Sequence, residues 1–431
     1  MGSIPVLGRL NFSDYVRIGL TFLFFLFESI LRLLFHMYSL VFDSTKSYDE
    51  RKDELKSNLK DLESFGSIAS HWGYPYEEHV VKTSDGYLLG THRISAPDSN
   101  PVNAQKNKPV ILLWHGFMMN SEVWVCNPMK ERNLCFLLAD AGYDVWLGNT
   151  RGNKYSYKHL YLKPNQKKFW DFSMDEYSLY DLPNTVDFIL ETTGASSLVY
   201  IGFSQGTAQA FASLSIHQEL NKKISLFVAL APAITPGGLH SSVVDTFLRA
   251  TPNIAYLLLG KKCALSSAVF WKDFLPRPLF VRAIDIAVGF LFGWHSQNID
   301  PEVKAIVYGH LYSYASVKGV VHWFQIINSG SFRFFDESPT IFPSSKATNG
   351  HICHPFTTNQ ITTPIVMFYG GSDSLCDIEV LKSQLPKLKN SHEIKHFEHL
   401  DFLWARDAKE LVYSEVFKVL EQHSLENPTQ C

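Results

Sequence analysis

A serine between two glycines is the first candidate for chemistry in this sequence. Gly202-Phe203-Ser204-Gln205-Gly206 fits the pattern G-x-S-x-G, which occurs once in the chain, after an apolar run at 197–201 and before a good helix-forming stretch at 207–220. A serine nucleophile on a tight strand–turn–helix junction requires small residues two positions before and after it. The pattern therefore predicts that Ser204 is a nucleophile. The alternative is an ordinary strand–helix loop with an exposed serine.

A catalytic serine needs two partners, because its hydroxyl is a weak nucleophile: a histidine that accepts its proton and a carboxylate that orients the histidine. In α/β-hydrolases the acid and then the base follow the nucleophile along the chain. Asp373 and His399 each come just after a strand-like run, and catalytic groups gather at the carboxyl ends of parallel strands. We expect these two residues to complete a triad, with Asp377 as an alternative acid and His396 or His392 as alternative bases.

Acyl transfer also needs two backbone N–H groups that stabilise the negatively charged oxygen of its intermediate. One should belong to Gln205, directly after the nucleophile, and the other to Phe117 in the loop WHGFMM at 114–119. His115 lies in the same loop, and we expect it to shape the turn and to take no direct part in the chemistry.

Two further patterns involve histidines near the predicted base. His392 and His396 fit H-E-x-x-H, which binds zinc when it lies on a helix. The alternation of the surrounding residues predicts a strand, on which the two histidines would be ~13 Å apart and too far for one zinc ion. His396 and Asp401 fit the H-x-x-x-x-D spacing of glycerolipid acyltransferases, but so short a pattern is common by chance. We therefore predict no metal and no organic cofactor.

Composition places the chain among globular proteins and gives no sign of a nucleic-acid partner. Of the 431 residues, 46% are hydrophobic and 19% are charged, and the formal net charge is −3 without a basic block. The cysteines are scattered and form no C-x-x-C pair, so neither a disulfide framework nor a zinc knuckle is indicated. They are Cys126, Cys135, Cys263, Cys353, Cys376 and Cys431.

The elements that must position the candidate residues alternate between strands and helices. Such alternation requires a mostly parallel sheet with helices on both faces, so we predict an α/β fold. The predicted strands lie within 79–94 (a hairpin around Ser84-Asp85-Gly86), 109–116, 143–152, 197–201, 224–233, 361–373 and 392–397, and the predicted helices lie near 131–141, 175–194 and 407–421.

The alternation lapses between about 234 and 363, where apolar helices and aromatic-rich loops replace it. The stretches 255–271 and 279–294 carry few charges, and we expect them to form a lid over the site; the alternative is that they only pack on the core. The predicted organisation is a membrane anchor (1–45), a polar linker (46–65), a first core segment (66–233), a helical lid (234–360) and a second core segment (361–425).

Residues 18–42 form an apolar run long enough to cross ~30 Å of hydrocarbon as a helix. No A-x-A-like site follows it, so a cleaved signal peptide fits badly. Glu28, Arg32 and His36 share one helical stripe, and a charge at mid-bilayer costs roughly 2.5–3.5 kcal/mol. We therefore favour a helix in the membrane interface, or a broken hairpin, with both ends cytosolic. A buried soluble helix is the alternative.

Glycosylation signals favour a cytosolic body. The only N-x-[ST] sequon begins at Asn11, whereas a secreted chain of this length would often carry several.

Taken together, these stretches resemble the acid lipase family of α/β-hydrolases and, within it, the fungal membrane-anchored steryl ester hydrolases. The resemblance covers most of the chain from about 66 to 410, in family order. The segments that carry it are GYPYEEHVVKTSDGYLL (73–89), WHGFMMNSEVWV (114–125), YDVWLGNTRGNKYS (143–156), FWDFSMDEY (169–177), GFSQGTAQ (202–209), SVKGVVHWFQ (316–325), YGGSDSL (369–375) and EHLDFLWARDA (398–408).

The resemblance implies an α/β-hydrolase fold with Ser204, Asp373 and His399 as the triad and with Phe117 and Gln205 as oxyanion donors. It also implies a lipid substrate, with sterol esters first and triacylglycerols second. Together with the N-terminal segment, it leads us to expect a lipid-droplet and endoplasmic-reticulum membrane enzyme whose catalytic body is cytosolic.

Two departures from the family are visible. HGF at 115–117 replaces the more usual HGL, which matters little because a backbone N–H does the work. The body also lacks the sequons of secreted and lysosomal relatives, so their acidic pH optimum is not expected here. A transacylase on the same triad is the alternative enzyme. A catalytically inactive membrane-binding module is the alternative outside the enzymes.

Overall fold

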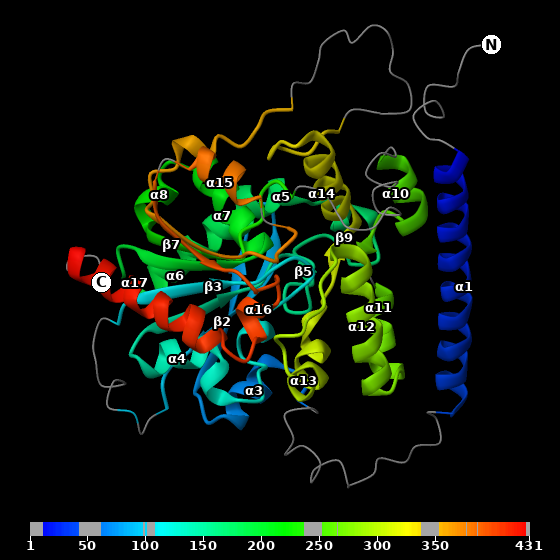
Figure 1. The fold of residues 1–431 in the computed structure, drawn as a ribbon, viewed down its shortest axis with the longest axis horizontal. Helices are drawn as coiled ribbons and strands as arrows, with labels where there is room; N and C mark the ends of the chain where they lie inside the picture. Colours follow the sequence, from blue (N-terminus) through cyan, green and yellow to red (C-terminus); the bar gives the residue numbers. More distant parts are fainter. Residues whose placement is uncertain are drawn as a thin grey trace, which may run out of the picture.

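The structure is a computed structural model that describes residues 12–42, 62–97, 100, 108–236, 252–264, 266–337, 353–375, 377–385 and 387–427. Its centre is a single mixed sheet with the strand order β1-β2-β4-β3-β6-β7-β10-β11, and the short β5 pairs with β2 (Figure 1). The strands are β1 (Tyr76–Lys82), β2 (Tyr87–Ile94), β3 (Val110–Trp114), β4 (Asp144–Gly148), β5 (Lys158–His159), β6 (Leu198–Phe203), β7 (Ile224–Leu230), β10 (Ile365–Gly370) and β11 (Leu388–Ile394).

The sheet is antiparallel at one edge and parallel elsewhere. β1 and β2 form the predicted hairpin, β2 pairs antiparallel with β4, and every pairing from β4 to β11 is parallel. All residues of β3, β4, β6 and β10 are buried, as expected for parallel strands covered on both faces. The predicted α/β-hydrolase fold with a mostly parallel sheet is confirmed.

Two hydrophobic clusters cover the two faces of the sheet. Alternate residues of β3 divide between them: Ile111 and Leu113 face one cluster, and Leu112 and Trp114 face the other, as the two-residue period of a strand requires. The helices that contribute to the first cluster include α3 (Phe65–His71), α4 (Leu134–Asp140), α16 (Asp401–Trp404) and α17 (Ser414–Glu426), and those of the second include α5 (Met174–Glu176), α6 (Leu182–Thr193), α7 (Gln205–Ile216), α8 (Leu220–Lys223) and α15 (Ile378–Gln384).

The last strand differs from the prediction. β11 begins earlier than expected and ends at Ile394, because the N–H of Phe397 turns back to the carbonyl of Ile394 at 3.0 Å. His396 therefore lies in a turn, and the strand geometry used to separate it from His392 does not apply to this pair. Within the described ranges no group of three His, Cys, Asp or Glu side chains is placed to hold a metal ion.

A helical segment interrupts the α/β alternation between β7 and β10, as predicted. The stretch 255–271 is not one helix, because a short strand, β8 (Cys263–Ala264), separates α10 from α11 and pairs with β9 (Ala315–Ser316). Residues 237–251 and 338–352 of the expected lid lie outside the described residues. The helices of the insertion are α10 (Pro252–Leu259), α11 (Ser266–Phe274), α12 (Arg277–Phe292), α13 (Pro301–Leu311) and α14 (Val317–Ser329).

The N-terminal apolar run forms α1 (Phe12–Phe42), which starts six residues earlier than predicted. Its segment Ser13–Phe35 has a mean hydropathy of 2.0 and none of its most apolar window is buried, so by length and composition it is long enough to cross a membrane. In Figure 1 α1 stands beside α10, α11 and α12, on the far side of them from the sheet. Most of the expected linker, 46–61, lies outside the described residues.

Candidate active site

The candidate nucleophile occupies a strained turn. Ser204 lies between β6 and α7 with φ 54° and ψ −122°, a backbone conformation that non-glycine residues rarely adopt. Such a conformation costs about 1–3 kcal/mol and is typical of active sites. The turn raises the serine out of the strand and places it at the N-terminus of α7. The structure therefore has the strand–turn–helix context that the pentapeptide predicted.

The two glycines of the pentapeptide are required by close backbone contacts. A Cβ atom on Gly202 would lie 2.9 Å from the carbonyl carbon of Gly206. A Cβ atom on Gly206 would lie 2.7 Å from the carbonyl oxygen of Trp114 and 2.8 Å from that of His115. A side chain on Gly206 would push the turn away from the end of β3, and one on Gly202 would push against Gly206 within the turn. The serine would move in either case.

The structure brings Ser204, Asp373 and His399 together in one hydrogen-bonded series. Nε2 of His399 lies 2.6 Å from Oγ of Ser204, and Nδ1 of His399 lies 2.7 Å from Oδ2 of Asp373. Because a carboxylate only accepts, Nδ1 donates to it, and Nε2 of the neutral ring is then the acceptor for the serine proton. All three side chains are buried.

Each member of the series follows the carboxyl end of a parallel strand. Ser204 follows β6, Asp373 follows β10 and His399 follows β11. The remaining oxygen of Asp373, Oδ1, accepts the backbone N–H of Leu375 at 3.0 Å. This second bond fixes the rotation of the carboxylate, so that Oδ2 is held toward the imidazole.

The alternative acid and bases lie elsewhere. Asp377 caps α15 by accepting the N–H of Val380. His392 stacks on Phe368 within the sheet, and His396 is half exposed beside Asp407. None of these three contacts involves Ser204 or His399.

The loop after β3 runs directly against the candidate nucleophile. A Cβ atom on Gly116 would lie 3.1 Å from the Cβ of Ser204, and Phe117 is the next residue in the chain. Gln205 is the first residue of α7, where backbone N–H groups have no partner inside the helix. Phe117 and Gln205 therefore flank the serine from two separate elements.

His115 braces this loop from the inside. Its Nδ1 lies 2.8 Å from the carbonyl oxygen of Gly116, and its Nε2 accepts the backbone N–H of Thr150 at 3.1 Å. Burial lowers the pKa of His115 to about 4, so the ring is neutral near pH 7 and can make both bonds. These contacts agree with a role in shaping the turn.

Two tryptophans of the helical insertion touch the site, and sequence reasoning missed both. The ring of Trp294 stacks on His399, with centroids 5.1 Å apart and planes 11° apart. Nε1 of Trp323 donates to Oε1 of Gln205 at 2.7 Å. Trp323 lies inside the segment SVKGVVHWFQ and Trp294 ends an apolar stretch, but neither position by itself indicated contact with the candidate site residues.

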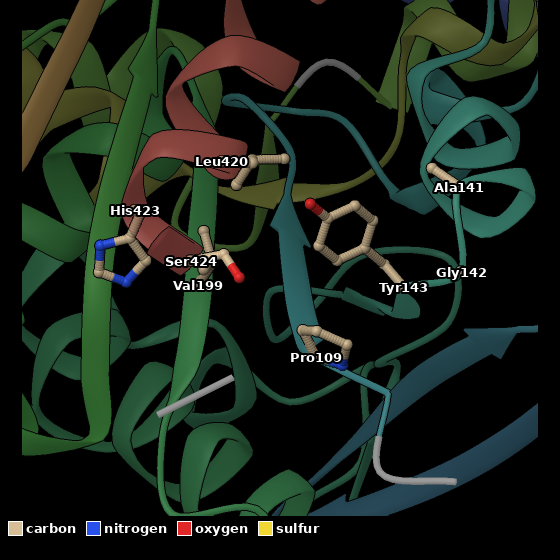
Figure 2. Close-up of a pocket in the computed structure, with 8 residues that line it drawn as sticks. All are labelled: Pro109, Ala141, Gly142, Tyr143, Val199, Leu420, His423 and Ser424. Atoms are coloured by element: carbon tan, nitrogen blue, oxygen red, sulfur yellow. The ribbon is translucent and has the colours of Figure 1, made fainter. Parts of the chain in front are cut away.

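A hollow at the amino-terminal ends of the parallel strands is unrelated to this site. It has a volume of about 170 Å³ and lies where β3, β4 and β6 begin (Figure 2). The candidate triad lies where the strands end, so the two are at opposite ends of the same strands. The hollow is lined by Pro109, Ala141, Gly142, Tyr143, Val199, Leu420, His423 and Ser424.

A parallel sheet with a serine, a histidine and a carboxylate at its carboxyl edge defines a serine hydrolase of the α/β type. Comparison with protein families gives the same class. Residues 109–406 match the alpha/beta hydrolase fold, and residues 65–128 match a partial alpha/beta-hydrolase lipase region. The chain belongs to the α/β-hydrolase lipase family and is therefore a serine carboxylic-ester hydrolase.

Named relatives match along most of their length. A probable lipase of Schizosaccharomyces pombe is 42% identical over 97% of this chain and 93% of its own. The gastric triacylglycerol lipase of Rattus norvegicus is 37% identical over 83% of this chain and 92% of its own. Among solved structures, the α/β-hydrolase GrgF from Penicillium covers 81% of this chain and 98% of its own, with 14% identity and a TM-score of 0.48.

Proposed function

We propose that the chain is a sterol ester hydrolase, which converts a steryl ester and water into a sterol and a fatty acid. Ser204 is the nucleophile, His399 is the general base and Asp373 orients the histidine. The observation that carries this proposal is the pair of hydrogen bonds, 2.6 Å and 2.7 Å long, that joins the three side chains at the carboxyl edge of the sheet.

The reaction has two steps. In the first, Oγ of Ser204 attacks the ester carbonyl while Nε2 of His399 takes its proton, and the N–H groups of Phe117 and Gln205 stabilise the resulting oxyanion. The imidazolium then gives its proton to the departing sterol oxygen. In the second step, His399 activates a water that attacks the acyl-serine and releases the fatty acid. Asp373 stabilises the imidazolium in both steps, and no cofactor is needed.

The substrate class follows from the surroundings of the site. An apolar helical insertion and an exposed apolar helix suit an ester that is insoluble in water. Sterol esters come first because the sequence resembles membrane-anchored steryl ester hydrolases. Triacylglycerols are the second candidate, because the rat relative is named a gastric triacylglycerol lipase.

We further propose that residues 1–45 anchor the chain and that 46–65 link the anchor to the body. The core then consists of 66–233 and 361–425, and 234–360 form the lid. This arrangement suits an enzyme that resides on lipid droplets and the endoplasmic-reticulum membrane with its catalytic body in the cytosol, where stored neutral lipid is mobilised.

The test measures fatty-acid release from cholesteryl oleate and triolein emulsions by the wild type and by Ser204→Ala. Release from the sterol ester that depends on the serine supports the whole proposal. Release from triolein alone keeps the mechanism and replaces the substrate. Acyl transfer to an added alcohol that outcompetes hydrolysis makes the enzyme a transacylase. Failure of a fluorophosphonate probe to label Ser204 in the folded protein makes it an inactive membrane-binding module.

A further inference from the structure

The helix α1 turns its charged residues toward the protein and its apolar residues outward. Asp14 is fully buried, and the side chains of Arg17, Glu28 and Arg32 are 35%, 14% and 30% exposed. These four positions fall within one stripe of the helix. Eleven large hydrophobic side chains between Val16 and Phe35 are 41% to 64% exposed. A helix between a protein and water shows the opposite arrangement.

The covered stripe of α1 contacts the lid helix α11. Oε1 of Glu28 accepts the indole N–H of Trp271 at 2.9 Å, and the other carboxylate oxygen of Glu28 lies 3.5 Å from Arg32. One turn further on, the ring of Phe35 meets Trp271 and Phe274 edge to face, with centroid distances of 5.4 Å and 6.0 Å. Glu28, on the polar stripe of the apolar helix, thus has a partner in the body of the protein.

The lid helices α10 to α12, which stand beside α1 (Figure 1), also carry exposed apolar side chains. Of the 22 large hydrophobic side chains that are exposed among the described residues, 11 lie on α1 and five lie on these three helices. The three on α12, which are Leu279, Ile286 and Phe290, fall on one stripe of that helix. The opposite side of α12 carries its buried residues, Phe280, Ile284 and Val288. The five are Leu257, Phe274, Leu279, Ile286 and Phe290.

The charges on the lid helices and their connections are mostly positive. The segment 252–292 has only two acidic residues, and one of them, Asp285, is paired with Lys304 at 3.0 Å. Basic side chains beside an apolar face attract anionic lipid head groups, each contributing about 1 kcal/mol near a charged surface. All five basic residues of the segment are exposed: Lys261, Lys262, Lys272, Arg277 and Arg282.

We propose that α1 and the lid helices form one lipid-binding face, in which α1 lies flat against the lid and does not span the bilayer alone. The inference deepens the proposed function, on whose membrane association it rests. Glu28 is near the middle of α1, so a separate span would remove it from Trp271 and place its charge at mid-bilayer, at a cost of roughly 2.5–3.5 kcal/mol. A shared face keeps the contact and holds the lid at the depth of the lipid substrate.

A face of this kind also fits a lipid droplet. A droplet is bounded by a single layer of lipid. A helix with two polar ends cannot cross this layer, because its far end would enter the oil, but an interfacial helix can lie in it. The same face therefore serves on a bilayer and on a droplet.

The test places the dye NBD on single cysteines of the full-length chain, reconstituted with phosphatidylcholine–phosphatidylserine vesicles. Cys263, Cys353, Cys376 and Cys431 are first replaced by serine. Ile286→Cys probes the lid, and Leu425→Cys on α17, which is 77% exposed and lies on the other side of the body from α1 (Figure 1), is the matched control. We expect the emission at position 286 to shift to shorter wavelength and to be quenched by spin-labelled lipids, and that at 425 to stay as in water.

A second measurement tests the seam between α1 and the lid. A short bis-maleimide should join Glu28→Cys to Trp271→Cys in the membrane but should not join Leu23→Cys, on the exposed side of α1, to Trp271→Cys. A dye at position 286 that remains in water while the protein binds vesicles and hydrolyses its ester overturns the shared face alone. A chain that hydrolyses the ester but does not sediment with vesicles overturns the membrane association as well.

Discussion

The indole ring of Trp294 lies parallel to the imidazole ring of His399, 5.1 Å away and tilted by 11°. Phe203 contacts the same imidazole at 5.1 Å with a tilt of 47°. The proposed base is therefore enclosed by one aromatic residue from the core and one from the helical insertion. Because Trp294 comes from the insertion, that segment contributes a side chain to the site.

Replacing Trp294 should test whether this stack positions His399. We expect Trp294→Leu to lower kcat for a short soluble ester by about tenfold, because a loosened imidazole spends less time aligned with the serine. Trp294→Phe keeps an aromatic ring and should stay near the wild type. The rate of fluorophosphonate labelling of Ser204 should fall in parallel with kcat. A change in KM alone would instead make Trp294 a wall of the substrate pocket.

Trp323 should support the proposed oxyanion donor Gln205. Trp323→Phe removes the 2.7 Å hydrogen bond to Oε1 of Gln205 while keeping most of the ring. One such bond contributes about 0.5–1.5 kcal/mol, so kcat/KM should fall roughly 2- to 12-fold. Gln205→Leu should then add little to Trp323→Phe, which a double-mutant cycle measures. Independent, additive effects would show that the bond does not couple the two residues.

Gly206→Ala should disrupt the turn that holds the nucleophile. The new methyl group would lie 2.7 Å and 2.8 Å from two carbonyl oxygens of the β3 end, and overpacking of this kind costs about 1–3 kcal/mol. We expect at least a tenfold loss of esterase activity. Gly309→Ala, in a helix and with nothing within 4 Å of the added group, is the control and should be neutral or stabilising by up to ~1 kcal/mol. Equal behaviour of the two variants would contradict the explanation.

The ionised Glu122 should contribute to the free energy of unfolding at pH values above about 4.5. This carboxylate is 3% exposed and lies 2.8 Å from both His310 and Lys154. Burial alone would raise its pKa, but the hydrogen bond and charge of His310, together with Lys154, lower the pKa of Glu122 to about 2 from its ordinary 4.5. Because the folded pKa is below the unfolded one, the stabilisation is present above pH 4.5 and is lost as the pH falls through 2, and it amounts to about 3 kcal/mol.

Denaturant unfolding in detergent can follow this dependence. Glu122→Gln should be less stable than the wild type by about 3 kcal/mol at pH 7, and the difference should shrink at pH 3. Glu421→Gln, at an exposed position of α17, should change little at either pH. If Glu122→Gln loses the same unfolding free energy at both pH values, the variant is destabilised for steric reasons and not by loss of the charge.

Much of the core and of the site could be predicted because the relevant signals are local. A buried parallel strand is a short apolar run, and the turns that hold Ser204 and Asp373 carry their own glycines. The proposed acid and base could be predicted because each lies just after a strand-like apolar run. The exact end of β11 was missed, since it depends on the bond from Phe397 back to Ile394, which leaves no mark in the periodicity.

Contacts between distant segments could not be predicted in this way. The partners of Trp294 and Trp323 are set by how the insertion folds back on the sheet. Likewise, periodicity placed Glu28 and Arg32 on one stripe of α1 but did not indicate that the Glu28 carboxylate bonds to Trp271, 243 residues away. Polarity reveals that a side chain needs a partner, but it does not say which one.

The distances along the chain within the triad have a consequence during synthesis. Ser204 and His399 are 195 residues apart, and the proposed acid and base are 26 residues apart. A nascent chain that has emerged as far as the helical insertion carries the serine turn but neither of its partners. With the proposed triad, hydrolytic activity cannot begin until β10 and β11 have been translated and have joined the sheet, so the enzyme stays inert until its fold is complete.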